Sequence, residues 1–294
     1  DVNVTSAAPI TAIRAGFWGN GDSVSEAVKA PYVRLVHAFG NFTPGLQLTG
    51  AGAPAHRALG QVVIPGAIGG TWNVPSGLSS LTVGDVSPDF NGTFAGPLGS
   101  FTSKTGFTGT LTAPSIGSLK VRANINLGHI HLTGPYAAGK FDLKTVVAPG
   151  GIAESEIFSA GSIGTISAAT LSNSLLYAGV ATLPAGQVLP ETISDFVAPA
   201  TIQAVTLHPK GKSVGFFNNG IAAQTLGNIQ LGLTTLDYSG NPDGIIGHTI
   251  AHFQATSATP PQKFDFSNLT SAAQVTALLT SQHLTLSLLI LGLV

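Results

Sequence analysis

The chain has 294 residues, of which 12 are Lys or Arg and 13 are Asp or Glu, and its formal net charge is −1. Charged residues make up 9% of the chain, against about 25% in typical soluble proteins. Nucleic-acid-binding proteins need a concentrated positive field, so this balance argues against that class. There is no Cys, which excludes disulfides, catalytic thiols and thiolate metal ligands.

Two further properties concern the compartment. The chain lacks Met and begins at Asp1, as expected for a chain processed or excised from a longer secreted protein. No apolar run reaches the ~18 residues of a membrane-spanning helix, so we expect no transmembrane segment. We predict an extracellular or cell-surface location.

Residues 1–60 are interpreted as N-terminal coils and a cap. In DVNVTSAAPI (1–10) Val2 and Val4 alternate with other residues, which predicts a strand able to pair with a neighbouring subunit. The segment 23–39, SVSEAVKAPYVRLVHAF, is one of two candidates for a helix. A helix at one of these two segments would cover an open end of the core.

A short phrase recurs through the central region, 61–268. It consists of an apolar residue followed by Gly, with small residues before it and alternating apolar residues after it. Clear copies centre on Ile68, Leu98, Ile116, Ile163, Ile202 and Leu226, and weaker ones lie around Leu78 and Ala137. The uneven spacing favours coils with regular strands and loops of different length. The gap from Ile163 to Ile202 holds either two coils or one coil with an insertion.

The copy LTAPSIGSLKV (111–121) gives the phrase a physical meaning. Alternation predicts a half-buried strand with Leu119 and Val121 inward and Lys120 outward. The small residues 113–115 indicate a corner. Gly117 is expected where the chain turns, since Gly tolerates left-handed conformations.

Strand, corner and strand repeated in this way predict an all-β fold, a single right-handed parallel β-helix. We expect roughly ten to thirteen irregular coils over residues 1–294, possessing at most a short capping helix. A βαβ fold lacks the amphipathic helices it requires. A β-sandwich stays open as an alternative, although it does not explain the repeated phrase.

Residues 269–294 are interpreted as a C-terminal cap and last strand. LTSAAQVTALLTSQH (269–283) is the better helix candidate, with an N-cap-like Thr or Ser before its apolar residues. In LTLSLLIL the apolar residues fall on one face of a strand. These residues, Leu284, Leu286, Leu288 and Ile290, are predicted to form a subunit-contact or capping strand.

Several of these segments in combination resemble a known family. GTLTAPSIGSLKV, SEIFSAGSIGTISAATLSNSLLYAGV and NNGIAAQTLGNIQLGLTTLD, together with LTLSLLIL, look like the β-helix modules of large secreted and surface proteins of planctomycete-type bacteria. The resemblance runs from about Ile10 to the C-terminus. It implies a right-handed parallel β-helix and an extracellular location, and it supplies no catalytic residues.

Few residues suggest metal binding. In LDYSGNPDG (236–244) the oxygen-bearing residues Asp237, Asn241 and Asp243 are a candidate calcium loop, although the same residues also build turns without metal. Calcium is the one cofactor considered. Two His pairs, His129 with His131 and His248 with His252, can each share a strand face. A structural role is the favoured interpretation of both pairs.

The remaining charged pairs bear on catalysis. The tightest carboxylate pairs are Asp85 with Asp89 and Glu154 with Glu156, and the basic pairs are Lys120 with Arg122 and Lys210 with Lys212. Polysaccharide-degrading β-helices need clustered carboxylates, so a non-enzymatic role is favoured.

We therefore expect an extracellular structural and interaction protein, a building block of a surface layer, filament or adhesin that associates with itself. The alternative is a secreted β-helix that binds or degrades polysaccharide. Cell-surface glycans are the second expected partner after the chain itself.

Overall fold

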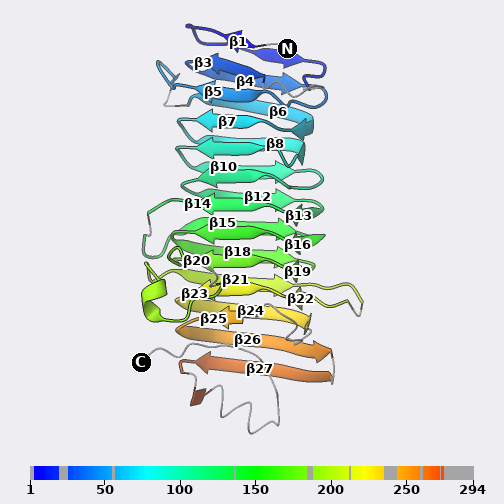
Figure 1. The fold of residues 1–294 in the computed structure, drawn as a ribbon, viewed down its shortest axis with the longest axis vertical. Coiled ribbons are helices and arrows are strands. Elements are labelled where there is room, and N and C mark those ends of the chain that lie inside the picture. The colour runs from blue at the N-terminus through cyan, green and yellow to red at the C-terminus, as the bar shows by residue number, and fades with distance from the viewer. Residues whose placement is uncertain are drawn as a thin grey trace. The chain divides into compact units, whose positions relative to one another are not determined.

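A computed structural model describes residues 3–19, 26–54, 57–135, 137–183, 188–211, 213–234, 244–258, 261–271 and 273–274. Two compact units are distinguished, Asp1–Thr133 and Gly134–Val294. Each unit is a stack of irregular coils built from short strands, drawn in Figure 1. The predicted parallel β-solenoid is therefore confirmed.

The first unit is built from strands that alternate between two parallel ladders. Its strands are β1 (Val4–Thr5), β2 (Ile13–Ala15), β3 (Ala27–Ala30), β4 (Val33–Ala38), β5 (Gly45–Leu48), β6 (Leu59–Ile68), β7 (Thr71–Val74), β8 (Leu78–Val86), β9 (Asn91–Phe94), β10 (Leu98–Ser103), β11 (Thr110–Ala113), β12 (Ile116–Val121), β13 (Asn124–Asn126) and β14 (His129–Leu132). One ladder runs β1-β3-β5-β7-β9-β11-β14 and the other runs β2-β4-β6-β8-β10-β12. Each coil thus adds one strand to each ladder.

The second unit repeats this plan and ends differently. Its elements are β15 (Phe141–Ala148), β16 (Gly151–Ala153), β17 (Glu156–Ser159), β18 (Ser162–Ala168), β19 (Leu171–Ser172), β20 (Leu175–Ala178), the 3₁₀ turn η2 (Ile193–Asp195), β21 (Thr201–Leu207), β22 (Phe216–Phe217), β23 (Gly220–Ala223), β24 (Thr225–Thr234), β25 (Gly244–Ile246), β26 (Thr249–Ala258) and β27 (Pro261–Leu269). Its ladders are parallel up to β26, which pairs with β27 in antiparallel fashion. A hairpin therefore closes the described part of this unit.

Buried side chains stack from coil to coil in the core of the first unit. In the ladder that contains β12, the register aligns Val36, Val62, Leu81, Phe101 and Leu119, and all five are buried. Each coil leaves apolar surface on its upper and lower sides, so only neighbouring coils can complete its burial.

Aromatic rings form a second stack in the same core. Trp18, Phe42, Trp72 and Phe90 follow one another with centroid separations of 5.6, 6.1 and 5.5 Å, each pair edge to face. Trp72 and Phe42 are fully buried, and the indole Nε1 of Trp72 donates a hydrogen bond to the carbonyl of Pro44 at 3.2 Å. Edge-to-face rings add specific attraction to the burial of area.

The recurring phrase marks the same place in successive coils. Leu98 pairs with Leu78 and Ile116 in the first unit, and Ile163, Ile202 and Leu226 align in the second. Those alignments are confirmed, including the weak copy at Leu78.

Two copies were assigned to the wrong residues. Ile68 pairs with Val86 near the end of its strand, and Leu59 begins the strand as Leu78 does in β8. Ala137 precedes β15, where Leu143 is the partner of Ile163. At Ile68 an apolar-Gly pair occurs away from the equivalent position, as chance allows in a chain with 37 Gly. At Ala137 the equivalent residue, Leu143, is followed by Lys144 and not by Gly.

The inward and outward residues of β12 are as predicted. Leu119 and Val121 are buried and Lys120 is exposed, and the corner before the strand is formed by residues 114–115. The role predicted for Gly117 is wrong, because Gly117 lies inside β12 without a positive φ. A Cβ atom built there would lie 2.4 Å from the carbonyl oxygen of Gly99 in the preceding coil. Close backbone approach therefore explains the glycine.

The helix considered for residues 23–39 is also wrong. Residues 27–38 form β3 and β4, separated at Pro31. Val33, Val36 and Ala38 are buried while Arg34 is exposed, so the apolar residues form the buried face of a strand. Proline restricts the residue before it to extended conformations, which favours the corner over a helix.

The gap from Ile163 to Ile202 holds one coil with an insertion, because these residues are register partners. The insertion follows β20 and includes η2. Leu189 of the insertion forms a buried cluster with Tyr177, Ala222 and Ile246, and the Tyr177 hydroxyl donates a hydrogen bond to the carbonyl of Val188. Burial raises the pKa of this hydroxyl above its ordinary value.

A helix is expected at 269–283, of which the structure describes residues 269–271 and 273–274. Leu269 is the last residue of β27 rather than helical. Residues 273–274 are helical. The Ser271 hydroxyl accepts the amide of Gln274 at 3.3 Å, and the Gln274 side chain accepts the amide of Ser271 at 3.2 Å. This reciprocal arrangement is a capping box, in agreement with the N-cap predicted there.

Candidate functional site

Two predicted sites lie outside the described residues. The calcium loop, Asp237, Asn241 and Asp243, is one of them, and the apolar strand of Leu284, Leu286, Leu288 and Ile290 is the other. Both stay predictions.

The pair His129 and His131 lies where the strand period puts it. Both residues of β14 are exposed, and Ile130 and Leu132 between and after them are buried. Within the described ranges no three residues of His, Asp or Glu gather closely enough to hold a metal ion. His129 and His131 lie on the exposed face of β14, in register with Thr110 and Thr112 of β11.

The two carboxylate pairs predicted from the sequence, Asp85 with Asp89 and Glu154 with Glu156, have mainly local structural roles. Asp85 accepts the amide of Gly106 at 2.9 Å, and Asp89 accepts the amide of Gly70 at 3.2 Å. Each carboxylate thus binds the backbone of a neighbouring coil. Glu154 is exposed in a left-handed turn with φ of 48°, whereas Glu156 begins β17.

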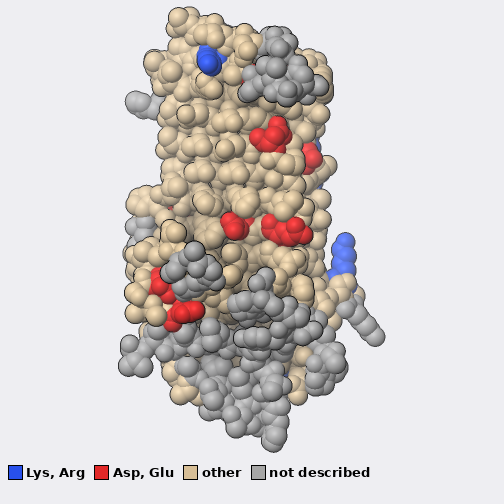
Figure 2. Space-filling model, in the orientation of Figure 1, with Lys and Arg blue, Asp and Glu red and all other residues tan. Residues whose placement is uncertain are grey.

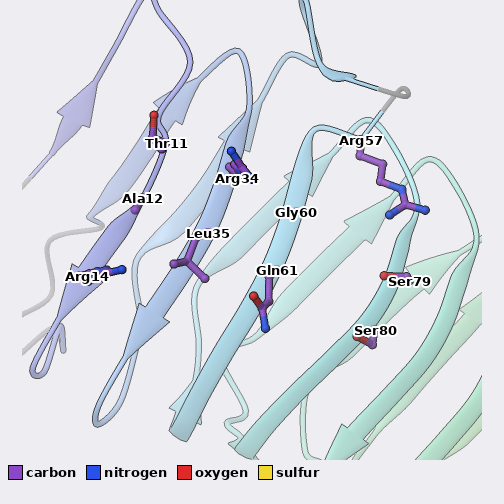
Figure 3. A pocket seen from close by; sticks show the side chains of 10 residues that line it. All are labelled: Thr11, Ala12, Arg14, Arg34, Leu35, Arg57, Gly60, Gln61, Ser79 and Ser80. Atoms are coloured by element: carbon purple, nitrogen blue, oxygen red, sulfur yellow. The ribbon is translucent and has the colours of Figure 1, made fainter.

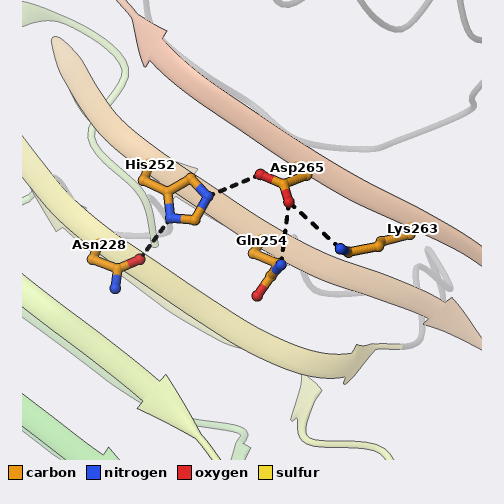
Figure 4. Close-up of polar contacts among 5 residues, drawn as sticks. All are labelled: Asn228, His252, Gln254, Lys263 and Asp265. Carbon is orange, nitrogen blue, oxygen red and sulfur yellow. Dashed lines mark hydrogen bonds and ion pairs between the residues drawn. The ribbon is translucent and has the colours of Figure 1, made fainter.

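His252 takes part in a polar cluster on the terminal hairpin, shown in Figure 4. Its Nδ1 lies 2.9 Å from Oδ1 of Asn228 and its Nε2 lies 2.9 Å from Oδ1 of Asp265. Gln254 donates to the same carboxylate at 3.2 Å, and Lys263 Nζ lies 3.6 Å from it. These contacts tie β24, β26 and β27 together on their outer face.

His248 is placed elsewhere. It precedes β26, and its Nδ1 atom is buried with no hydrogen-bond partner among the described residues. The predicted pair therefore does not act as a unit, because only His252 reaches the cluster.

The contacts of Asp265 predict an acid-sensitive step in stability. The hydrogen bond from His252 is the main cause that lowers the pKa of Asp265 below its ordinary value of 3.8. A lowered pKa stabilises the fold above 3.8 and loses that contribution as the pH falls through the folded-state pKa. We expect wild type to unfold at higher urea concentration than Asp265→Asn at neutral pH.

That difference should shrink below about pH 4. Urea unfolding followed by circular dichroism at several pH values measures it. His252→Gln should lose most of the same acid dependence. A parallel pH profile for wild type and Asp265→Asn would contradict the assignment.

A groove on the first unit gathers most of the chain's arginines. Arg14 lies on β2, Arg34 on β4 and Arg57 just before β6, and all three side chains are exposed. Together they line a shallow cavity of about 670 Å³. The other lining residues are Thr11, Ala12, Leu35, Gly60, Gln61, Ser79 and Ser80, which are drawn in Figure 3.

Gly60 explains why the surface is hollow at this point. A Cβ atom built on Gly60 would lie 2.1 Å from the carbonyl oxygen of Arg34, so the two backbones touch. Arg34 and Leu35 rise from β4 on one side and Ser79 and Ser80 from β8 on the other. Figure 3 shows the Arg57 side chain directed toward Ser79. The groove thus follows from the coil register.

The charges of this groove are unusual for this chain. Arg14, Arg34 and Arg57 are three of its four Arg residues, and the described residues that line the cavity include no carboxylate. No ion pair joins them to an acid in the part of the chain that the structure describes. Charge is sparse in the chain as a whole, and on the face drawn in Figure 2 the described surface is largely uncharged, with isolated acidic and basic residues.

None of the sequence motifs pointed to this groove. The arginines are far apart in the sequence, and no short pattern joins them. The sequence contains one indirect signal: consecutive arginines are about one coil apart along the chain. Arg34 lies in β4, and Arg14 and Arg57 lie in the coils on either side of it. This signal depends on the coil boundaries near the N-terminus, where residues 23–39 are a candidate helix from the sequence alone.

Comparison of the chain with protein-family models, with curated proteins and with solved structures finds no match in any of the three. No helix within the described ranges is long and apolar enough to span a membrane.

Proposed function

We propose that the chain is an extracellular structural and interaction protein, a β-solenoid building block that associates with copies of itself. The resemblance to secreted β-helix modules supports the location. The observation that carries the proposal is an open strand edge on the first coil.

The edge is formed by β1 and β2. Among the described residues β1 pairs with β3 and β2 pairs with β4, and each has its partner on one side only. The amide of Ser6 donates to the carbonyl of Lys29 at 2.9 Å. Successive amides along a strand point to opposite sides, so the amide of Thr5 points to the open side. Such an edge is a template for another strand.

The described part of the second unit offers a complementary edge. Its last strand, β27, pairs with β26 alone within the described residues. We therefore propose that a strand of a second copy adds to the edge of β1 and β2, in a head-to-tail arrangement. Sparse charge favours association, because little electrostatic repulsion opposes it.

We expect Thr5→Pro to reduce self-association, because proline removes the amide that faces the open side. Sedimentation velocity over a range of protein concentrations measures the assembly state. Wild type should form larger species as concentration rises, and Thr5→Pro should shift that growth to roughly tenfold higher concentration.

Thr5→Val is the matched control, since valine keeps the backbone amide and suits a strand. It should assemble as wild type does. A wild-type chain that stays monomeric at high concentration would refute the proposal, and so would equal assembly of a correctly folded Thr5→Pro chain.

A further inference from the structure

We propose that the groove over β2, β4, β6 and β8 binds an acidic polysaccharide through Arg14, Arg34 and Arg57. The groove shares β2 with the open edge proposed above for self-association, but it uses side chains, whereas the edge uses backbone groups. Its ligand is a polymer whose sugar rings carry carboxylates.

Charge gives the first reason. Three arginine residues line one groove whose described lining includes no carboxylate, in a chain whose net charge is −1. Arg presents a planar fork of donors that matches a carboxylate with two hydrogen bonds. With no described acid to neutralise them, the three groups are free to bind external anions.

The spacing of the charges gives the second reason. Arg14, Arg34 and Arg57 belong to three successive coils, and neighbouring parallel strands lie about 4.8 Å apart. The three are staggered rather than aligned, because Arg14 is in register with His37, three residues past Arg34, and Arg57 precedes β6. Cations spread diagonally over three coils suit an extended chain with repeated anionic groups better than a single small anion. Binding several repeats at once raises the affinity beyond that of one contact.

The neutral groups of the groove suit the rest of a sugar ring. Thr11, Ser79 and Ser80 supply hydroxyls and Gln61 supplies an amide. These groups both donate and accept hydrogen bonds, as sugar hydroxyls require.

Two exposed aromatic rings, Phe17 and Phe39, lie just after the ends of β2 and β4 and outside the lining of the groove. Arg14 pairs in register with His37, and the His37 ring lies 4.5 Å from that of Phe39. Phe17 and Phe39 are 66% and 69% exposed, and a Cβ atom on Gly40 would lie 3.5 Å from the Phe17 ring. Exposed rings offer flat apolar faces on which the C–H face of a sugar packs.

A nucleic acid fits the groove less well. Three cations neutralise only a few phosphates, and tight non-specific binding needs more contacts. The surface around the groove adds little positive charge, because the first unit's other cations lie on other strands or turns. Single-stranded DNA therefore serves as the competing ligand in the test.

Binding to immobilised polygalacturonate, neutral dextran and single-stranded DNA, measured by surface plasmon resonance with the full chain, tests the proposal. We expect polygalacturonate to bind, dextran not to bind, and DNA to bind at least about tenfold more weakly. Arg34→Gln should weaken binding of polygalacturonate roughly threefold to tenfold. The triple Gln variant of Arg14, Arg34 and Arg57 should weaken it on the order of 100-fold.

Arg122→Gln is the matched control, because Arg122 is the fourth Arg and lies outside the groove in the turn after β12. It should bind as wild type does. Phe39→Ser should weaken binding while leaving its salt dependence unchanged, since it removes no charge. Circular dichroism confirms that each variant is folded.

Three results would overturn the proposal. They are no binding of polygalacturonate by wild type, equal binding of DNA and polygalacturonate, and equal losses for Arg34→Gln and Arg122→Gln. None of them bears on self-association, which sedimentation measures separately.

Discussion

Trp72→Ala is expected to destabilise the protein by about 3–5 kcal/mol, the range for removing a large aromatic side chain from a core. Trp72 is fully buried, and its ring lies between Phe42 and Phe90 with centroid separations of 6.1 and 5.5 Å. Alanine would leave a cavity in the middle of the aromatic stack and leave the carbonyl of Pro44 without its indole donor. The midpoint of urea unfolding, followed by circular dichroism, measures the loss.

Phe17→Ala is the control for this experiment, because Phe17 is also aromatic but 66% exposed. Its effect on stability should stay within about 0.5 kcal/mol. Trp72→Phe should cost less than Trp72→Ala, since it keeps a ring in the stack. Equal midpoints for Trp72→Ala and Phe17→Ala would show that the stack does not support the core.

The sequence predicts which residues are buried within one strand, but not which buried residues of different coils contact one another. Alternation is a local property, so it assigned Leu119 and Val121 to the core and Lys120 to the surface. Buried partners such as Phe42 and Trp72 lie a full coil apart. They meet through register, which depends on where every corner falls, and no local pattern contains that information.

The groove was missed for the same reason. Arg34 lies in the segment 23–39, a candidate helix because its apolar residues also fit a helical pattern, and a helix there would leave no coil for Arg34. Pro31 was the local signal against a helix, because it separates β3 from β4. With that corner in place, Arg14, Arg34 and Arg57 fall on successive coils. A functional surface of a solenoid is therefore visible in a sequence only after each coil has been delimited.

The glycine of the recurring phrase is a real structural feature, but its physical reason differs from the predicted one. Gly117 was expected to provide a turn, yet it lies inside a strand with an ordinary φ. Ile116 points inward, Gly117 and Ser118 are half-buried, and Leu119 points inward again, so the strand bends here. At such a bend the backbone comes close to the previous coil. The same close approach occurs at Gly164 and Gly227, where a Cβ atom would lie 2.3 and 2.1 Å from a carbonyl oxygen.

Gly117→Ala should therefore destabilise the protein, although alanine usually favours the folded state by restricting the unfolded chain. The added Cβ atom would lie 2.4 Å from the Gly99 carbonyl oxygen, and this backbone atom cannot rotate away as a flexible side chain would. The two coils must separate locally, which weakens the ladder between β10 and β12. We expect a loss of about 1–3 kcal/mol, the usual cost of overpacking, measured by urea unfolding.

Gly16→Ala separates this effect from a general cost of replacing glycine. Gly16 has no positive φ, and a Cβ atom there would have no other atom within 4 Å. Its replacement should leave stability unchanged or raise it by up to about 1 kcal/mol. If Gly117→Ala were as stable as Gly16→Ala, close coil contact would not be the reason for the glycine. The opposite result would make the apolar-Gly pair a marker of bends between stacked coils.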